Sequence, residues 1–234
     1  VLDGIHLMQT WSGDARLDSL ITSKSAQSHP EIANLIGHHL EICPNTQVHW
    51  VDETLWESIS ELENAPQIMG LLQLELTKPN SKTITGDVLI LDAIQDAGNV
   101  GTILRTALAT DFKQIVCTTG TAHIWSPKVL RAAMGAHRHL HFYEGWSVND
   151  VASNIESSLL ATTMDAKDDL YSIGKILNAP VAWIFGNEGQ GVSGDLLAQA
   201  KQIRIPQNPQ IESLNVATAA AVCLYETVRA RTAQ

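Results

Sequence analysis

The 234-residue sequence contains little of several residue types that would assign it to a class. Its three cysteines, Cys43, Cys117 and Cys223, are far apart and odd in number, which excludes a disulfide framework and a C-x-x-C metal pair. No apolar run approaches the ~18 residues of a membrane helix, and the first residues lack the pattern of a signal peptide. We therefore expect a protein of the reducing cytoplasm with no membrane segment.

Basic side chains are also scarce. Lys and Arg number 15 against 25 Asp and Glu, a net charge of −10. Residues 1–80 hold 3 basic and 11 acidic side chains, and residues 81–234 hold 12 and 14. A protein that neutralises phosphates by bulk charge needs a surplus of Lys and Arg. Any nucleic-acid function must therefore come from a local site.

The composition is otherwise that of a globular protein, with 44% hydrophobic and 17% charged residues, and it argues against general disorder. The clearest break in the pattern is the segment 77–82, where Pro, Asn and Ser interrupt the apolar residues and the charge balance changes. We predict two domains, residues 1–78 and residues 79–234.

Within the first domain, the segment 2–8 leads into a helix, and residues 47–51 and 69–74 are strand candidates. Asp52 is a suitable N-cap for a helix beginning at Glu53. Nothing in this domain indicates catalysis.

The second domain alternates strand and helix patterns. Strands are predicted at 87–92, 114–118, 140–143, 159–163, 181–185 and 203–206. Helices are predicted after Asn99 as cap, from Pro127 to Ala133, after the glycines at 195–201, and from Ser213 or Asn215 to about Arg231. This alternation predicts an α/β fold with a mostly parallel sheet and helices on both faces.

Three segments of this domain carry polar groups where strands end, which is where α/β sheets bind ligands. They are N-x-G-x-x-x-R from Asn99 to Arg105, the glycine-rich stretch 185–194, and the stretch 203–221 with Ile-Pro followed by Ser-Leu-Asn-Val-Ala. Taken singly, each also fits a structural role, because Asn and Ser cap helices and alanines allow close helix packing.

Residues 189–194 also spell G-x-G-x-x-G, the dinucleotide-binding pattern. The glycines come late after the strand, the helix that follows is short, and Pro206-Gln207-Asn208-Pro209 stands where a ribose-binding acid is required. We therefore set a nucleotide-dependent oxidoreductase aside.

His137, His139 and His141 alternate, which predicts one face of a strand and raises the question of a metal site. No carboxylate or cysteine lies in the same segment, so ordinary strand histidines are the favoured interpretation and no metal is expected.

Together, the three polar segments closely resemble the three motifs of the SpoU (TrmH-like) RNA ribose 2′-O-methyltransferases of the SPOUT superfamily. The resemblance covers residues ~85–230, in the order and spacing of that family. Residues 1–78 look like the family's small ribosomal-protein-like α/β domain for substrate binding, and the match there is weaker.

The resemblance implies a homodimeric enzyme with a C-terminal trefoil knot that binds S-adenosylmethionine and releases S-adenosylhomocysteine. Carried over by position, the residues implied to form the catalytic cluster are Arg105, Asn99, Glu188, Ser213 and Asn215. The residues implied at the cofactor are Gly186, Ile205, Leu214, Phe185, Pro206 and Val216.

The family account makes Arg105 the general base, although arginine is normally protonated. We hypothesise that Arg105 instead stabilises the developing alkoxide and grips a phosphate, and that Glu188 orients Arg105 or Asn99. Lys128, Arg131 and Arg138 are candidates for a basic strip that faces RNA, with ordinary surface charge as the alternative.

The expected substrate is ribosomal RNA, with transfer RNA as the second candidate. A non-catalytic RNA-binding or assembly factor on the same fold is a further alternative, against which the joint presence of the five cluster residues argues. The acidic first domain is expected to select RNA, and relatives have a basic stretch before it, so we expect an N-terminal segment to be missing from this sequence.

Overall fold

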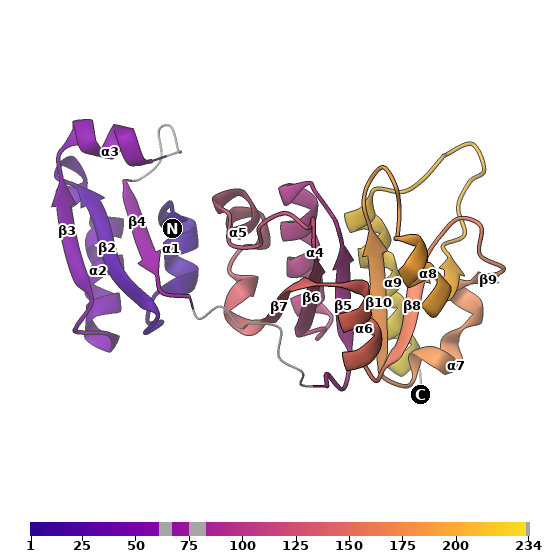
Figure 1. Cartoon of the computed structure of the whole chain (residues 1–234). Coiled ribbons are helices and arrows are strands. Elements are labelled where there is room, and N and C mark those ends of the chain that lie inside the picture. The colour runs from indigo at the N-terminus through magenta and orange to yellow at the C-terminus, as the bar shows by residue number, and fades with distance from the viewer. Residues whose placement is uncertain (61–66, 75–82, 233–234) are drawn as a thin grey trace. The chain divides into compact units, whose positions relative to one another are not determined.

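The computed structural model describes residues 1–60, 67–74 and 83–232. These residues form two compact units, which are described separately (Figure 1). The first unit holds residues 1–76 and 125–138, and the second holds residues 77–124 and 139–234. The part of the chain described contains no helix that is long and apolar enough to cross a membrane.

The first unit is built on a four-stranded mixed sheet in the order β1-β4-β2-β3. Strand β2 pairs parallel with β3 and antiparallel with β4, and β1 pairs antiparallel with β4. Its helices and strands are β1 (Leu2–Asp3), α1 (Ile5–Trp11), β2 (Leu17–Ser23), α2 (Pro30–Ile42), β3 (Gln47–Val51), α3 (Glu53–Ile59) and β4 (Ile68–Leu72). A core of apolar side chains from α1, α2 and the sheet holds the unit together, with Trp11 and Leu20 fully buried in it.

Several sequence predictions for this unit are confirmed. The strand at 47–51 has its predicted bounds, and the Asp52 carboxylate accepts a hydrogen bond from the Leu55 amide at 2.9 Å, as an N-cap does. The buried strand predicted at 69–74 begins one residue earlier and ends two residues earlier, at 68–72. Strand β2 and helix α2 were not predicted, although residues 30–42 begin with a proline at the first helical turn and bury Ile32, Leu35 and Ile36.

The segment 125–138 belongs to the first unit, although it lies between two strands of the second. Helix α5 (Pro127–Ala133) has its predicted bounds, and Leu130 joins the core of the first unit. The Arg138 guanidinium pairs with the Asp14 carboxylate at 3.2 Å and donates to the Thr10 carbonyl at 2.6 Å. These contacts attach the segment to residues near the N-terminus.

The second unit contains a seven-stranded sheet in the order β7-β6-β5-β10-β8-β11-β9, and all neighbouring strands in it pair in parallel (Figure 1). The strands are β5 (Val88–Asp92), β6 (Gln114–Thr118), β7 (His141–Trp146), β8 (Ser158–Thr162), β9 (Asp168–Asp169), β10 (Val181–Gly186) and β11 (Lys201–Arg204). The predicted α/β fold with a parallel sheet is therefore confirmed.

Helices cover both faces of this sheet. They are α4 (Ala97–Ala109), α6 (Val148–Asn154), α7 (Gly174–Leu177), α8 (Gly194–Gln199) and α9 (Val216–Thr232). Ile90 and Ile184 pack in one core cluster with Val151 of α6 and Leu196 of α8. Trp183, which precedes Ile184 in β10, faces the other side of the sheet. Its indole N–H donates to the Thr227 hydroxyl of α9 at 3.0 Å.

Two local predictions are wrong. Asp96, not Asn99, caps α4: its carboxylate accepts from the Asn99 amide at 2.8 Å, which places Asn99 inside the first turn. The alternating histidines do not share a strand face, because residues 136–139 form a 3₁₀ turn with His137 buried, and β7 begins only at His141. The described residues contain no group of three metal-ligating side chains.

Candidate active site

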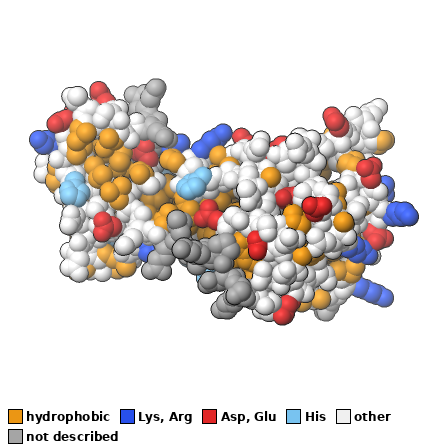
Figure 2. Space-filling view, viewed as in Figure 1, with side chains coloured by type: hydrophobic (Ala, Val, Ile, Leu, Met, Phe, Trp, Pro, Cys, Tyr) orange, Lys and Arg blue, Asp and Glu red, His pale blue; other side chains and the backbone are white. Residues whose placement is uncertain are grey.

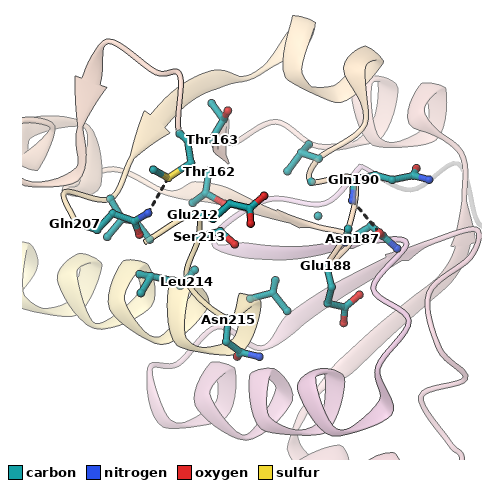
Figure 3. Close-up of a pocket in the computed structure, with 18 of the residues that line it drawn as sticks. Thr162, Thr163, Asn187, Glu188, Gln190, Gln207, Glu212, Ser213, Leu214 and Asn215 are labelled. Atoms are coloured by element: carbon teal, nitrogen blue, oxygen red, sulfur yellow. Dashed lines mark hydrogen bonds between the residues drawn. The ribbon is translucent and has the colours of Figure 1, made fainter. Parts of the chain in front are cut away.

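A cavity of about 540 Å³ lies at the carboxyl ends of β8, β10 and β11 (Figure 3). It is formed where the segment after β8, the glycine-rich loop (residues 186–194) and the segment 205–216 meet. Neighbouring parallel strands end at one edge of the sheet, so loops far apart in sequence converge there. The lining residues are Thr162, Thr163, Met164, Gly186, Asn187, Glu188, Gly189, Gln190, Gly191, Val192, Leu197, Ile205, Gln207, Glu212, Ser213, Leu214, Asn215, Val216 and Ala219.

The glycine-rich loop owes its shape to a close backbone approach and an internal turn. A Cβ atom on Gly186 would lie 2.1 Å from the carbonyl carbon of Gly191 and from the Val192 amide nitrogen, so only glycine fits. The Asn187 side-chain oxygen accepts from the amides of Gly189 and Gln190 at 2.9 and 3.1 Å. The loop therefore turns back on itself at the end of β10.

Two polar side chains, half-buried Asn187 and buried Asp92, attach this loop to neighbouring strands. The Asn187 side-chain amide donates to the Ala93 carbonyl at 2.9 Å. Asp92, buried at the end of β5, accepts from the Ser193 amide at 2.7 Å and from the Thr118 hydroxyl at 2.9 Å. Because a buried carboxylate is costly without partners, these bonds hold the loop in place.

The Glu188 carboxylate binds the start of α4. One oxygen accepts from the Asp96 amide and the Asn99 side-chain amide, at 3.1 and 3.0 Å, and the other accepts from the Gln95 amide at 3.1 Å. Burial raises the pKa of Glu188, but the hydrogen bond from Asn99 and those from backbone amides outweigh it, so the pKa lies below its usual value. Glu188 is therefore ionised at neutral pH and serves as an acceptor.

Asn99 connects Glu188 to the third polar segment. Its side-chain oxygen accepts from the Asn215 side-chain amide at 2.9 Å. The Asn215 oxygen in turn accepts from the amides of Ala217 and Thr218, at 2.9 and 3.2 Å, and so caps α9. We call Asn99, Glu188 and Asn215 the amide–carboxylate cluster. It draws one residue from each of the three polar segments.

The other residues singled out from the sequence lie at several places. Ser213 lines the cavity beside Glu212 (Figure 3). Of the six cofactor candidates, Gly186, Ile205, Leu214 and Val216 line it, whereas Phe185 and Pro206 do not. Phe185 is fully buried in the sheet and stacks on Trp183 with ring centroids 6.1 Å apart, because residues two apart in β10 face the same side of the sheet.

Arg105 is not part of the amide–carboxylate cluster. Its side chain is exposed on α4, does not line the cavity, and makes no hydrogen bond or ion pair with any described residue. Of the predicted basic strip, Lys128 is exposed on α5 with Arg131 one turn away, and Arg138 is occupied by its ion pair with Asp14. Lys and Arg side chains stand in small separate groups on the face in Figure 2.

The sequence reasoning missed the part of the cavity contributed by residues 162–164, and it also missed Gln207 and Glu212. The Gln207 side-chain amide lies 3.1 Å from the Met164 sulfur, which joins two of these segments (Figure 3). A strand was predicted at 159–163, so its carboxyl end was a usable signal. What was lacking was the knowledge that β8 pairs with β10.

The chain matches the model of the SpoU rRNA Methylase family over residues 87–225, more than half of its length. It is 33% identical over 190 residues to the 23S rRNA (guanosine(2553)-2′-O)-methyltransferase RlmP of Bacillus subtilis, covering 76% of this chain and 71% of that protein. It is 41% identical over 145 residues to an uncharacterized tRNA/rRNA methyltransferase of Synechocystis. That match covers 60% of this chain and 52% of the Synechocystis protein. The chain therefore spans about half the length of that relative.

The fold also matches solved structures. The SpoU methyltransferase AviRb of Streptomyces viridochromogenes, solved in complex with AdoMet, superposes with a TM-score of 0.81 at 19% identity. The superposition covers 100% of this chain and 90% of that one. At this identity the likeness establishes the fold alone, and it extends over both units.

Proposed function

Because this chain belongs to the SpoU rRNA methylase family, we propose that it transfers a methyl group from S-adenosylmethionine to a ribose 2′-hydroxyl of RNA, with ribosomal RNA as the substrate. One observation carries the proposal: the amide–carboxylate cluster joins the three polar segments at the edge of one cavity. A helix cap or a structural turn alone would not require residues of three separate segments to bond one another there.

The cavity suits S-adenosylmethionine in size and lining. Its volume of about 540 Å³ falls within the ~300–1,000 Å³ of small-molecule sites. Ile205, Leu214 and Val216 supply apolar surface, and the glycine-rich loop supplies backbone groups that no side chain shields. When bound, the cofactor supplies the methyl group, and the protein supplies position and charge.

The proposed work of the protein is to hold the 2′-hydroxyl in line with the methyl group and to stabilise its oxygen as the proton leaves. Ser213 and Asn215 are proposed to position the ribose at the cavity edge. Arg105 is proposed to stabilise the alkoxide and bind the adjacent phosphate, since its guanidinium has no partner among the described residues. The homodimer implied by the family resemblance belongs to the same proposal.

The named relatives favour ribosomal RNA. The Bacillus protein is named for 23S rRNA, and the Synechocystis protein for tRNA or rRNA, so transfer RNA is the second candidate. The RNA would be bound mainly by residues 81–234 or by the dimer, because residues 1–80 hold only 3 basic against 11 acidic side chains. A cytoplasmic location belongs to the same proposal and agrees with the three free thiols.

The test combines binding and methyl transfer. Isothermal titration with S-adenosylmethionine and S-adenosylhomocysteine should give micromolar dissociation constants. Unmodified ribosomal RNA and transfer RNA are then incubated separately with S-adenosylmethionine that carries a labelled methyl group. The label should enter ribosomal RNA rather than transfer RNA, and the product should resist alkaline cleavage at one ribose. Binding without transfer to any RNA would favour the non-catalytic alternative.

A further inference from the structure

The charged lining of the cavity is entirely acidic. Among the described residues that line it, Glu188 and Glu212 are the only charged side chains, and no Lys, Arg or His is present. A cavity with this lining favours a ligand that carries positive charge. The two carboxylates are not equivalent, and the difference between them identifies which one is available to a ligand.

Glu188 is already fully engaged. Both of its oxygens accept hydrogen bonds from the start of α4, including one from Asn99. Glu212, in contrast, makes no hydrogen bond or ion pair with any described residue, and its carboxylate points into the cavity from the segment that precedes α9 (Figure 3). Glu212 is therefore the free carboxylate among the described residues that line the cavity.

We infer that Glu212 binds the α-ammonium group at the amino-acid end of the cofactor; this inference rests on the proposed function. S-adenosylmethionine carries two cations, the ammonium and the sulfonium. The ammonium offers three N–H donors, which a carboxylate binds through charge-assisted hydrogen bonds, whereas the sulfonium offers none.

The chemistry of methyl transfer also favours the ammonium. The sulfonium loses its positive charge as the methyl group leaves, so an ion pair to it would stabilise the ground state more than the transition state and would slow the reaction. The ammonium keeps its charge throughout. A carboxylate bound to it contributes affinity at no expense in rate, and it fixes the end of the cofactor opposite the adenine.

The inference is tested by the binding of three ligands to wild type and to Glu212→Gln: S-adenosylmethionine, S-adenosylhomocysteine and 5′-methylthioadenosine. The first two contain the ammonium, and the third lacks the whole amino-acid part. Glu212→Gln should weaken both ammonium-containing ligands by a similar factor, about tenfold. It should leave the dissociation constant of 5′-methylthioadenosine within about twofold of wild type. Glu156→Gln removes an exposed carboxylate that does not line the cavity, and it should change none of the three constants.

Each other outcome overturns the inference. Weakening of S-adenosylmethionine alone would assign Glu212 to the sulfonium. Equally weaker binding of all three ligands would mean that Glu212 contacts the adenosine part or supports the folding of the loop. Unchanged binding of all three would mean that Glu212 does not contact the cofactor. If wild type bound none of the ligands, the proposed function itself would fail, which the wild-type titration alone reveals.

Discussion

The side-chain amide of Asn215 donates to the side-chain oxygen of Asn99 at 2.9 Å, although 116 residues separate the two in sequence. Each asparagine has a second attachment, Asn99 to Glu188 and Asn215 to the first turn of α9. The bond therefore connects the start of α4 to the start of α9 beside the cavity. Its partners fix which way the Asn99 amide is oriented, because only that orientation serves both an acceptor and a donor.

This dual use of Asn99 predicts that Asn99→Asp disrupts the site. The substitution removes the N–H donor and places a carboxylate oxygen against Glu188 at the 3.0 Å separation of the present bond. We expect a loss of stability of about 1–3 kcal/mol in urea unfolding and at least tenfold weaker binding of S-adenosylmethionine.

Asn208→Asp is the matched control for this change. The Asn208 side-chain oxygen accepts from the Gln210 amide at 2.9 Å, a bond that an aspartate can also make. It should therefore behave as wild type in both measurements. Equal effects of the two substitutions would show that the amide–carboxylate cluster has no special part in the site.

Gly186→Ala should deform the glycine-rich loop. The added methyl group would lie 2.1 Å from backbone atoms of residues 191 and 192, which cannot move as a flexible side chain can. We expect a stability loss of about 1–3 kcal/mol and loss of measurable cofactor binding. Gly194→Ala, where nothing lies within 4 Å of the new Cβ, should change neither stability nor binding appreciably. A Gly186→Ala protein with wild-type affinity would contradict the assigned site.

Arg105→Ala should separate activity from stability. Because the exposed Arg105 side chain has no partner among the described residues, its removal should change the free energy of unfolding by less than about 0.5 kcal/mol. Affinity for S-adenosylmethionine should stay near wild type, while methyl transfer to RNA should fall by at least a hundredfold.

Arg105→Lys distinguishes a guanidinium role from a simple charge. Lysine keeps the positive charge but loses the planar bidentate donors, so only a small part of the rate should return. Full retention of the rate in the lysine variant would exclude a specific guanidinium role, and full retention in the alanine variant would remove Arg105 from the reaction.

Protonation of the buried His39 should lower the stability of the protein in mildly acidic solution. Its Nδ1 accepts from the Gly13 amide at 3.0 Å, and its Nε2 lies 2.9 Å from the Thr46 hydroxyl, so the buried ring is neutral. Burial lowers its pKa below 6.5, against an opposing effect of Asp14. The stabilisation is therefore complete above pH 6.5 and is lost as the pH falls through the folded-state pKa, since the unfolded state binds more protons.

Urea unfolding between pH 7.5 and 5.5 measures this effect. Wild type should lose stability as the pH is lowered, and His39→Gln should show a flatter dependence in the same range. His49→Gln, which changes an exposed histidine of β3, should keep the wild-type slope. Parallel pH profiles for wild type and His39→Gln would exclude the buried ring as the source.

Sequence periodicity predicted most elements of the second unit, because its strands are short apolar runs followed by capped helices. β6 has the predicted bounds, and Asn215 caps α9 as one of the two proposed residues. Helix α5 of the first unit also has its predicted bounds. Periodicity was less informative at the start of a helix, where a polar residue can be either the N-cap or part of the first turn. Asn99 looked like a cap, but Asp96 three residues earlier is the cap, since both residue types favour that place.

The sequence by itself determined the family resemblance and the residue types at the site, because N-x-G-x-x-x-R, F-G-N-E-G-x-G and S-L-N-V-A are local patterns in the chain. Which of these residues meet was decided only by the tertiary structure. The sheet order places β8 between β10 and β11, which brings residues 162–164 to the same cavity as the glycine-rich loop and the segment that holds Glu212. Arg105 lies farther along α4, outside the amide–carboxylate cluster. Strand order depends on contacts between residues far apart in sequence, and no local pattern records them.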